Sequence, residues 1–402
     1  MNLTKKAKMI IISVVVAFVM IVGIIAMILL VPLKGKENTY TWSKTDDFNE
    51  LVMSKNSPVI TLNKKVDENF KILVLTDMQL WTKANDNKEA FGLASRLIDK
   101  ENPNLVVLTG DNVSSVTAPY LLKDLIEFFE KKGVEKDFYW APVFGNHDNE
   151  VKATPNWSAD QYEKASIHNG GRCLFSKGPN NLGGTVGNYV INIKEEGEII
   201  QSLYMMDNSQ YIDYPQDMKD YFGRGNKEKY ITHQQISWFE WNASNVNKIS
   251  NKIVPSMVFT HFAQYEALEA FNSMIAGEDK IMATADDMQK DFSGKYKVPN
   301  GMGFGAYSYA PGVPLINTGF IDKAKALGLH LALFGHDHEN DAVIEYEGVT
   351  YGYGLKAGPS PRPWNDATEF GGTTIVFNSK NANKPIITHV VDKQASDYWG
   401  NK

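Results

Sequence analysis

Five apolar, β-branched runs recur along the chain, and each run ends in a cluster of polar residues. Their sequences are KILVLTD, NLVVLTGD, FYWAPVFGNHD, IVPSMVFTH and LHLALFGHDH, beginning at residues 71, 104, 138, 253 and 329. Apolar runs without polar interruption predict strands that are buried on both faces of a sheet. The polar ends of such strands would gather along one edge of the sheet, where α/β proteins place their binding sites.

Segments with helical spacing separate these runs. Residues 87–103 follow the first run, residues 120–133 follow the second, and residues 233–248 precede the fourth. We expect the second of these helices to end at Gly133, because glycine is the usual residue just beyond a helix. Alternating strands and helices predict an α/β architecture.

The rest of the chain has weaker or different periodicity. Residues 151–230 and 271–315 are long and irregular, so we expect them to form loops that border the site. Within the first stretch, residues 187–207 predict a hairpin. Residues 342–354 and 371–392 alternate with a period of two and predict further antiparallel strands.

The N-terminal segment has the pattern of a membrane anchor. Residues 9–31 carry no charged side chain and as a helix would reach roughly 34 Å, which is enough for the bilayer core. The alternative is a cleaved secretory signal. The apolar run is too long for one, and no small-residue cleavage site precedes Pro32, so an uncleaved anchor is favoured.

The anchor divides the chain into four parts. Residues 1–8 form a short basic tail whose Lys5, Lys6 and Lys8 predict a cytoplasmic N-terminus. Residues 9–31 are the transmembrane segment, residues 32–65 a polar tether, and residues 66–402 the folded domain. We therefore expect a single-pass protein of the cell membrane with its large domain outside the cytoplasm.

Charge and cysteine content narrow the function. The chain has 41 Lys and Arg against 47 Asp and Glu, a net charge of −6 at pH 7. That balance argues against nucleic acid as a partner, because phosphate backbones are bound by clustered basic residues. Cys173 is the single cysteine, which excludes an internal disulfide framework and a zinc site of several thiolates.

The polar ends of the five runs supply oxygen and imidazole donors. They are Asp77, Gln79, Asp111, Asn146, His147, Asp148, His261, His336 and His338. His336 and His338 are two residues apart, so in an extended backbone their side chains point to the same side. Such donors suit Mn, Fe or Zn. Two ions about 3.5–4 Å apart would hold a phosphate and lower the pKa of a shared water.

Taken in order, the motifs resemble those of calcineurin-like metallophosphoesterases. The resemblance covers roughly Lys71 to Asp341, and the ending FGHDHEND is most similar to the purple-acid-phosphatase-related branch. It implies a sandwich of two β-sheets flanked by helices. It also implies a phosphoesterase with two metal ions that hydrolyses phosphate esters by attack of a metal-activated hydroxide.

The resemblance also implies a role for each donor. One ion would be held by Asp77, Asp111, His338 and Gln79, and the second by Asp111, Asn146, His261 and His336. Asp111 would then bridge the two ions. His147 would act as general acid or as a charge stabiliser on the phosphate, and Asp148 would orient its ring.

Three positions bear on these roles. Gln79 stands where the family commonly has histidine, so either its neutral amide ligates weakly or it lies outside the coordination sphere. No tyrosine closely follows Asp111, which argues against the tyrosinate-coloured ferric site of true purple acid phosphatases. Lys356 could meet a substrate phosphate, although a solvated loop is the more ordinary interpretation of its surroundings.

Two other functions remain open on the sequence. The same centre could act on phosphodiesters, such as glycerophosphodiesters, nucleotides or envelope polymers, because the loops and not the ligands select substrate arms. A binding protein whose catalytic site has decayed is the other alternative, with Gln79 as its first sign.

Overall fold

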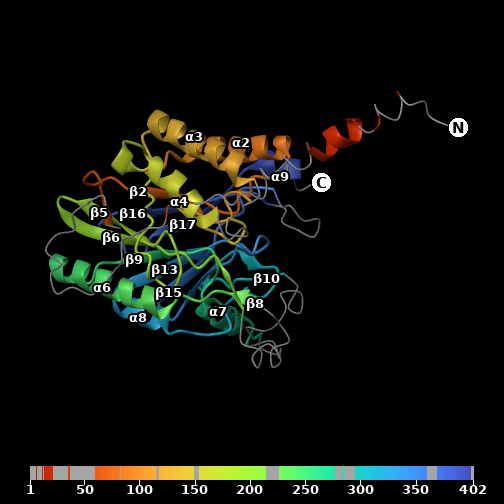
Figure 1. Ribbon diagram of the computed structural model, residues 1–402. Helices are drawn as coiled ribbons and strands as arrows, with labels where there is room; N and C mark the ends of the chain where they lie inside the picture. The colour runs from red at the N-terminus through yellow and green to blue at the C-terminus, as the bar shows by residue number, and fades with distance from the viewer. Residues whose placement is uncertain are drawn as a thin grey trace.

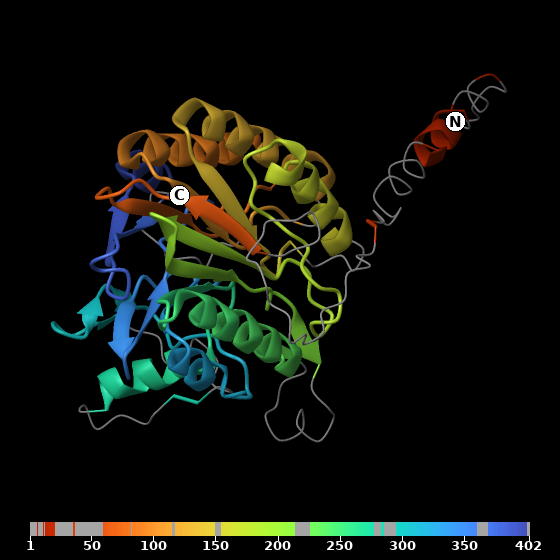
Figure 2. The ribbon, with the colours of Figure 1, turned by 90° about the vertical axis from the view of Figure 1, so that its left-hand side faces the viewer.

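Two β-sheets lie face to face between layers of helices in the computed structural model (Figures 1 and 2). The structure describes residues 6, 11, 13–20, 35–36, 59–81, 83–114, 117–148, 154–213, 226–276, 283–284, 295–359 and 369–399. The two-sheet arrangement flanked by helices agrees with the predicted architecture.

The smaller sheet has the strand order β17-β16-β2-β3-β4. Its parallel part consists of β2 (Phe70–Leu75), β3 (Leu105–Thr109) and β4 (Tyr139–Val143), which correspond to the first three apolar runs. The antiparallel strands β16 (Gly371–Phe377) and β17 (Ile386–Val391) extend it beyond β2, as the period-two pattern predicts.

The larger sheet has the order β1-β5-β6-β9-β13-β15-β14-β11. Its strands are β1 (Val59–Asn63), β5 (Tyr189–Glu195), β6 (Glu198–Met205), β9 (Ser256–Phe259), β13 (Leu329–Phe334), β15 (Val349–Tyr353), β14 (Val343–Tyr346) and β11 (Gly303–Phe304). β9 and β13, the last two apolar runs, pair in parallel. The predicted hairpin is confirmed by the antiparallel pairing of β5 with β6.

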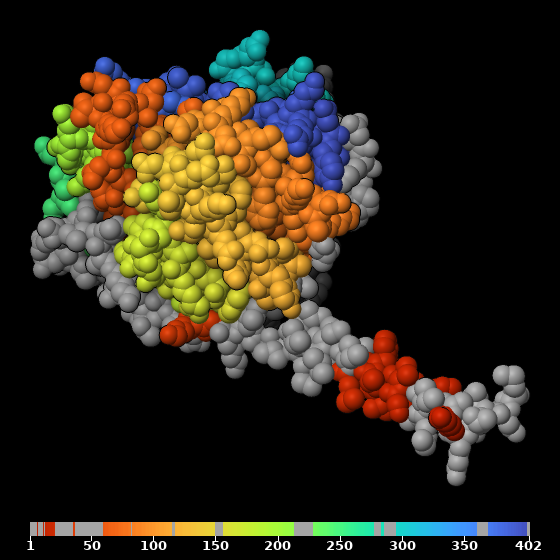
Figure 3. Space-filling model, turned by 90° about the horizontal axis from the view of Figure 1, so that it is seen from above, coloured from red at the N-terminus to blue at the C-terminus, as the bar shows by residue number. Residues whose placement is uncertain are grey.

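Helices cover the outer face of each sheet. α2 (Ala84–Glu101), α3 (Ala118–Lys136), α4 (Thr154–Lys164) and α9 (Lys393–Trp399) lie on the side of the smaller sheet. From above, α2, α3 and the C-terminal α9 form one continuous face (Figure 3). α6 (His233–Ser250), α7 (Tyr265–Ile275) and α8 (Phe320–Ala326) lie on the side of the larger sheet.

The core is divided by the larger sheet, because successive side chains of a strand point to opposite faces. In β9, Met257 and Phe259 belong to the cluster between the two sheets. Val258, between them in sequence, belongs to the cluster under α6, α7 and α8. Burial on both faces explains why this run is apolar without interruption.

Three sequence expectations need correction. α3 does not end at Gly133 but continues to Lys136, and Gly133 O accepts hydrogen bonds from the backbone N–H groups of Asp137 and Phe138. β1 falls inside the predicted tether, yet it pairs with β5 and belongs to the folded domain. The sequence predicts that residues 151–230 border the site, but the predicted hairpin within them, β5 and β6, lies inside the larger sheet.

The predicted membrane segment is mostly outside the described residues. Within the part of the chain that the structure does describe, no helix is both long and apolar enough to cross a membrane.

The short strands β7 (Tyr211–Asp213), β8 (Asn226–Glu228), β10 (Tyr296–Lys297) and β12 (Ala306–Tyr307) form two small two-stranded sheets.

Candidate metal centre

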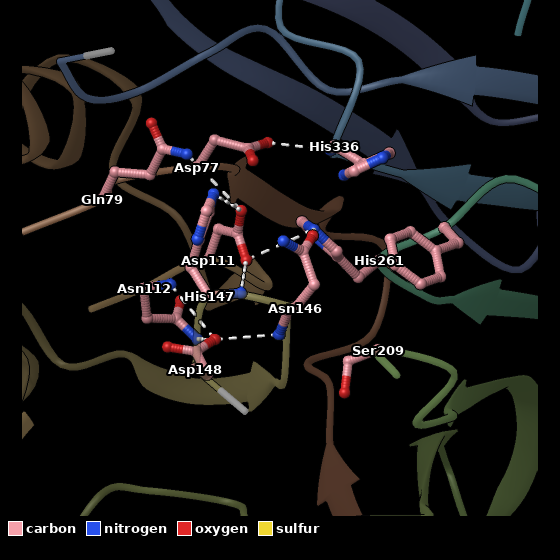
Figure 4. A network of polar contacts seen from close by, with 12 residues as sticks. Asp77, Gln79, Asp111, Asn112, Asn146, His147, Asp148, Ser209, His261 and His336 are labelled. Atoms are coloured by element: carbon pink, nitrogen blue, oxygen red, sulfur yellow. Dashed lines mark hydrogen bonds and ion pairs between the residues drawn. The ribbon is translucent and has the colours of Figure 1, made fainter. Parts of the chain in front are cut away.

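The predicted donors come together at the ends of β2, β3, β4, β9 and β13 (Figure 4). Four of them have backbones in the left-handed region: Asp77 at φ 52°, Gln79 at φ 44°, Asp111 at φ 49° and His336 at φ 74°. This conformation costs free energy in residues other than glycine and persists only where surrounding contacts hold it. Strain at four donors marks this edge as a functional site.

Backbone hydrogen bonds hold these strained turns in place. The N–H of Asp77 donates to Gly110 O at 3.2 Å, and the N–H of Gln79 donates to Asp111 O at 2.8 Å. The turn after β2 is thus fastened to the turn after β3. Donors far apart in the sequence are therefore fixed relative to one another by the main chain.

Two motif glycines allow the turns to approach closely. A Cβ on Gly145 would lie 2.1 Å from Asp111 N, and a Cβ on Gly335 would lie 2.0 Å from Thr76 Oγ1. Both distances are far below van der Waals contact. The glycines of GNHD and GHDH are thus required by packing against the carboxylate turns.

The first donor set consists of Asp77, Asp111 and His338, whose ligand atoms all lie within 4.8 Å of one another. His338 Nε2 is 3.2 Å from Asp77 Oδ1. Burial alone would raise the pKa of Asp77, but the neighbouring His338 and His261 hold it well below its usual range. Both carboxylates are therefore ionised and attract positive charge to this position.

Gln79 reaches the first set through its amide nitrogen. Its Nε2 lies 3.1 Å from His338 Nε2 and 3.4 Å from Asp111 Oδ2. Its Oε1 accepts a hydrogen bond from Lys356 Nζ at 2.9 Å. Figure 4 shows the nitrogen end of the amide facing the donors and the oxygen end facing away. In this orientation the amide nitrogen faces the donors, whereas ligation of a metal ion would need the amide oxygen there. The predicted ligation by Gln79 would therefore require the amide to turn over.

Lys356 is buried beneath the first set, with only 1% of its surface exposed, so the solvated-loop interpretation is wrong. A bridge between Thr76 and Lys356 places the segment after β15 beside the end of β2. Burial lowers the pKa of the Lys356 ammonium to about 8. Burial and the charge of Lys356 together lower the pKa of His338.

The second donor set is built around His261, which is fully buried. Its Nδ1 lies 2.9 Å from Thr109 O, to which it donates. Nε2 lies 3.0 Å from Asn146 Oδ1 and 3.4 Å from Asp111 Oδ1. Burial alone would lower the pKa of His261, but Asp111 outweighs it and raises that pKa to about 9.

This geometry fits a cation. When a metal ion replaces the proton on Nε2, His261 keeps its Nδ1–H donating to Thr109 and offers the Nε2 lone pair. The two oxygens that face it, on Asn146 and Asp111, are acceptors as well. Three acceptors that converge are satisfied by a positive ion between them, and imidazole with carboxylate and amide oxygens is a donor set typical of first-row metals. The residues of the second set therefore fit a metal ion.

His336 adds a second imidazole beside His261. The two rings have centroids 5.3 Å apart, and His336 packs edge-on against Phe262 at 4.6 Å. Its backbone N–H donates to Asp77 Oδ2 at 3.1 Å, which links the turn after β13 to the first set. His336 thus lies beside the second set and His338 in the first, although the backbone of His336 is left-handed and not extended as the spacing argument assumes.

His147 lies at the open side of the group. Its backbone N–H donates to Asp111 Oδ1 at 2.8 Å, and its Nε2 is 3.8 Å from Asp111 Oδ2. The His147 side chain is 15% exposed, whereas that of Asp111 is 1% exposed. His147 is therefore placed where a solvent-borne ligand can meet it.

Asp148 organises the neighbouring turns. Its carboxylate accepts from the N–H groups of Val113 at 2.9 Å, Gly145 at 2.8 Å and Asn112 at 3.2 Å. Among the described residues, no hydrogen bond or ion pair joins this carboxylate to the His147 ring. Burial raises the pKa of Asp148, and the charge of Asp111 raises it further, to about 7. The Asp148 carboxylate therefore contacts backbone N–H groups, and these contacts do not include the predicted one that would orient the His147 ring.

Sequence reasoning missed two polar residues that support the donors. Asn208 is buried and its Oδ1 accepts from the N–H groups of His261 and Phe262 at 3.2 and 3.1 Å. Glu228 Oε1 lies 3.8 Å from His336 Nε2. The sequence signal for Asn208 is the polar end of the apolar run that precedes it, a pattern that is equally typical of a turn. Glu228 gave none.

Comparison with known proteins agrees with the site. The model of the calcineurin-like phosphoesterase family matches residues 70–340. A relative from Arabidopsis thaliana named "Probable inactive purple acid phosphatase 29" is 24% identical, over 65% of this chain and 61% of its own length. A second, named "Probable inactive purple acid phosphatase 14", is 23% identical over 74% of this chain and 72% of its own length. The chain thus spans about three fifths of the first relative.

A dimetal phosphatase from Danio rerio is similar in structure. It has 8% sequence identity and a TM-score of 0.45, over 80% of this chain and 95% of its own. The family match covers most of the folded domain, including every predicted donor. The chain belongs to the calcineurin-like phosphoesterase family, in the branch related to purple acid phosphatases.

Proposed function

We propose that this protein is a membrane-anchored phosphoesterase that hydrolyses phosphate esters at a centre of two metal ions. The observation that carries the proposal is that Asp111 belongs to both donor sets: its ligand atom lies within 4.8 Å of those of Asp77 and His338, and its Oδ1 lies 3.4 Å from His261 Nε2. A carboxylate placed between two sets can belong to both. The natural ions are drawn from Mn, Fe and Zn.

Residues of the two sets would hold the ions. Asp77 and His338 would hold one, Asn146, His261 and His336 the other, with Asp111 common to both. When bound, two ions supply charge neutralisation for the phosphoryl oxygens and lower the pKa of a water between them. The protein's own contribution is to fix these donors on strained turns before substrate arrives.

His147 would act on the leaving group. Its side chain is 15% exposed, so its Nε2 can face a bound ester while Asp111 remains buried. A proton on Nε2 would pass to the leaving-group oxygen as the ester bond breaks. Asp148 would fix the turn that carries His147, because its carboxylate accepts hydrogen bonds from the N–H groups of Val113 and Gly145.

The test is the replacement of Asp111 by asparagine, which keeps the shape and removes the charge. We expect hydrolysis of an aryl phosphate to fall at least about a thousandfold, because each metal contributes several kcal/mol of charge stabilisation. Asp99→Asn is the matched control, since Asp99 is a partly exposed partner of Lys132 and Lys136 on α2 and α3. Full activity in Asp111→Asn would end the proposal.

The residues around the centre would determine whether the protein prefers a phosphate monoester or a diester. Comparing the rates on a mono- and a bis-aryl phosphate distinguishes the two. We propose the monoester as the first substrate to test.

A second function is favoured by a specific observation. The Gln79 oxygen is engaged by Lys356, and two relatives are named inactive. A protein that binds a ligand without hydrolysing it would have this pattern. Its signature would be metal-dependent binding of inorganic phosphate by a protein with no turnover of either aryl ester.

Anchoring and location are part of the proposal. The uncharged residues 9–31 support a single-pass anchor, and the lysines before it support a catalytic domain outside the cytoplasm.

A further inference from the structure

The Gln79 amide occupies a particular place in the first donor set. Its nitrogen lies 3.1 Å from His338 Nε2 and 3.4 Å from Asp111 Oδ2. An amide NH2 carries two donors, so it can donate to Asp111 Oδ2 and, in the tautomer of His338 with its proton on Nδ1, to His338 Nε2 as well. These are the atoms that a metal ion in the first set would need.

Lys356 determines this orientation. An ammonium group has donors only, so the atom that faces Lys356 Nζ at 2.9 Å must be the amide oxygen. Lys356 is itself held in place, with 1% exposure and a backbone bridge to Thr76. Turning the amide over would bring NH2 against the ammonium and remove its nearest acceptor. The nitrogen is therefore locked toward the donors.

The two sets differ in this respect. In the second set, His261 Nε2 faces Asn146 Oδ1 and Asp111 Oδ1, which are both acceptors. In the first set, the amide nitrogen of Gln79 already faces two of the donor atoms. A cation entering the second set meets the oxygens of Asn146 and Asp111, whereas a cation entering the first set must displace an amide and lie near a buried lysine.

We propose that Lys356 and Gln79 form a lock on the first set, so that the centre loads in two steps. The first ion enters the set of Asn146, His261 and His336, and the second ion binds the set of Asp77 and His338 much more weakly. The inference rests on the proposed function, since it concerns the same centre. It makes Lys356 a positioning residue that acts on metal affinity through Gln79.

Titration of the metal-free, full-length protein with Mn²⁺, followed by electron paramagnetic resonance, tests this directly. In the wild type, the first equivalent of Mn²⁺ should give the signal of an isolated ion. The signal of a spin-coupled pair should grow only with excess metal. A coupled signal that grows from the first addition would overturn the inference, and this measurement needs no variant.

Three variants identify the cause. Lys356→Met frees the amide to present its oxygen, so affinity for the second ion should rise by about 10–100-fold, the range known for groups that contact ligands. Lys356→Arg keeps the charge and donors and should resemble the wild type. Lys64→Met is the matched control, because Lys64 is a buried lysine paired with Glu195. Circular dichroism verifies that each variant is folded.

Equal affinity for the second ion in Lys356→Met and the wild type would overturn the lock, and so would an arginine variant that behaves like methionine. These results are distinguishable from failure of the proposed function. Paired loading together with metal-dependent hydrolysis contradicts only the inference. A protein that binds no Mn²⁺ at either set contradicts both.

Discussion

At the scale of single residues, the site depends on glycines that let two turns meet. Replacing Gly145 by alanine would place a Cβ 2.1 Å from Asp111 N and 2.2 Å from Asp111 Oδ1, so the shared carboxylate must move. We expect Gly145→Ala to lose about tenfold or more in Mn²⁺ affinity, measured by calorimetric titration.

Gly92→Ala is the control for this prediction. Gly92 lies in α2, and the nearest atom to an added Cβ is the flexible end of Arg96 at 2.9 Å. Its Mn²⁺ affinity should equal that of the wild type. If Gly145→Ala bound metal as tightly as Gly92→Ala, the close approach would not be what positions Asp111.

Glu266, which lies away from the site, makes the free energy of unfolding depend on pH. Burial raises its pKa from 4.5 to about 7. Between these values the folded protein retains a proton that the unfolded chain releases, so the free energy of unfolding falls as pH rises, by up to about 3 kcal/mol. Glu266→Gln removes the charge, and urea unfolding at pH 5 and pH 8 should show a smaller difference than in the wild type. An unchanged difference would assign the pH dependence to other groups.

At the scale of elements, α6 shows how a helix start is specified. Thr232 Oγ1 accepts from the Gln235 N–H, and Gln235 Oε1 accepts from the Thr232 N–H, which is a complete capping box. We expect Thr232→Ala to lower the free energy of unfolding by about 1 kcal/mol, as measured by urea titration. Thr232→Ser retains the hydroxyl and should recover most of the loss. A serine variant as unstable as alanine would mean that the methyl group, not the cap, matters.

The elements also show what a sequence pattern can predict. The five apolar runs are recognisable because burial on both faces forbids polar interruption, and their polar ends include the residues that meet at this edge of the sheets. The role of each of these residues as a metal ligand stays a prediction. β1 was missed because VITLN is short and its partner β5 lies far along the chain. The end of α3 was misplaced because Gly133 contributes a carbonyl to the cap and does not end the helix itself.

At the scale of the whole molecule, contacts between distant segments determined what the sequence did not indicate. Lys356 is polar and follows a hairpin, which is typical of a surface loop. Only the pairing of its segment with the end of β2 buries it beside Gln79. Glu228 likewise lies in a three-residue strand, too short to be recognised, and reaches His336 through tertiary structure.

The membrane anchor also yields a prediction at this scale. Because residues 9–31 would cross the bilayer, full-length protein should remain in the membrane pellet after extraction with alkaline carbonate. Protease added to intact cells with the outer layers removed should degrade the folded domain, because it is expected outside the cytoplasm. Release of the full-length chain by carbonate, or complete protection from protease, would contradict the proposed anchoring or orientation.

The central claim is that one carboxylate, Asp111, is shared by two metal ions. Anomalous X-ray diffraction from crystals saturated with Mn²⁺, measured at the manganese absorption edge, locates the ions without any assumption about activity. We predict two peaks, one among Asn146, His261 and His336 and the other between Asp77 and His338, both in contact with Asp111. Peaks that do not touch Asp111, or none at this edge of the sheets, would contradict the account.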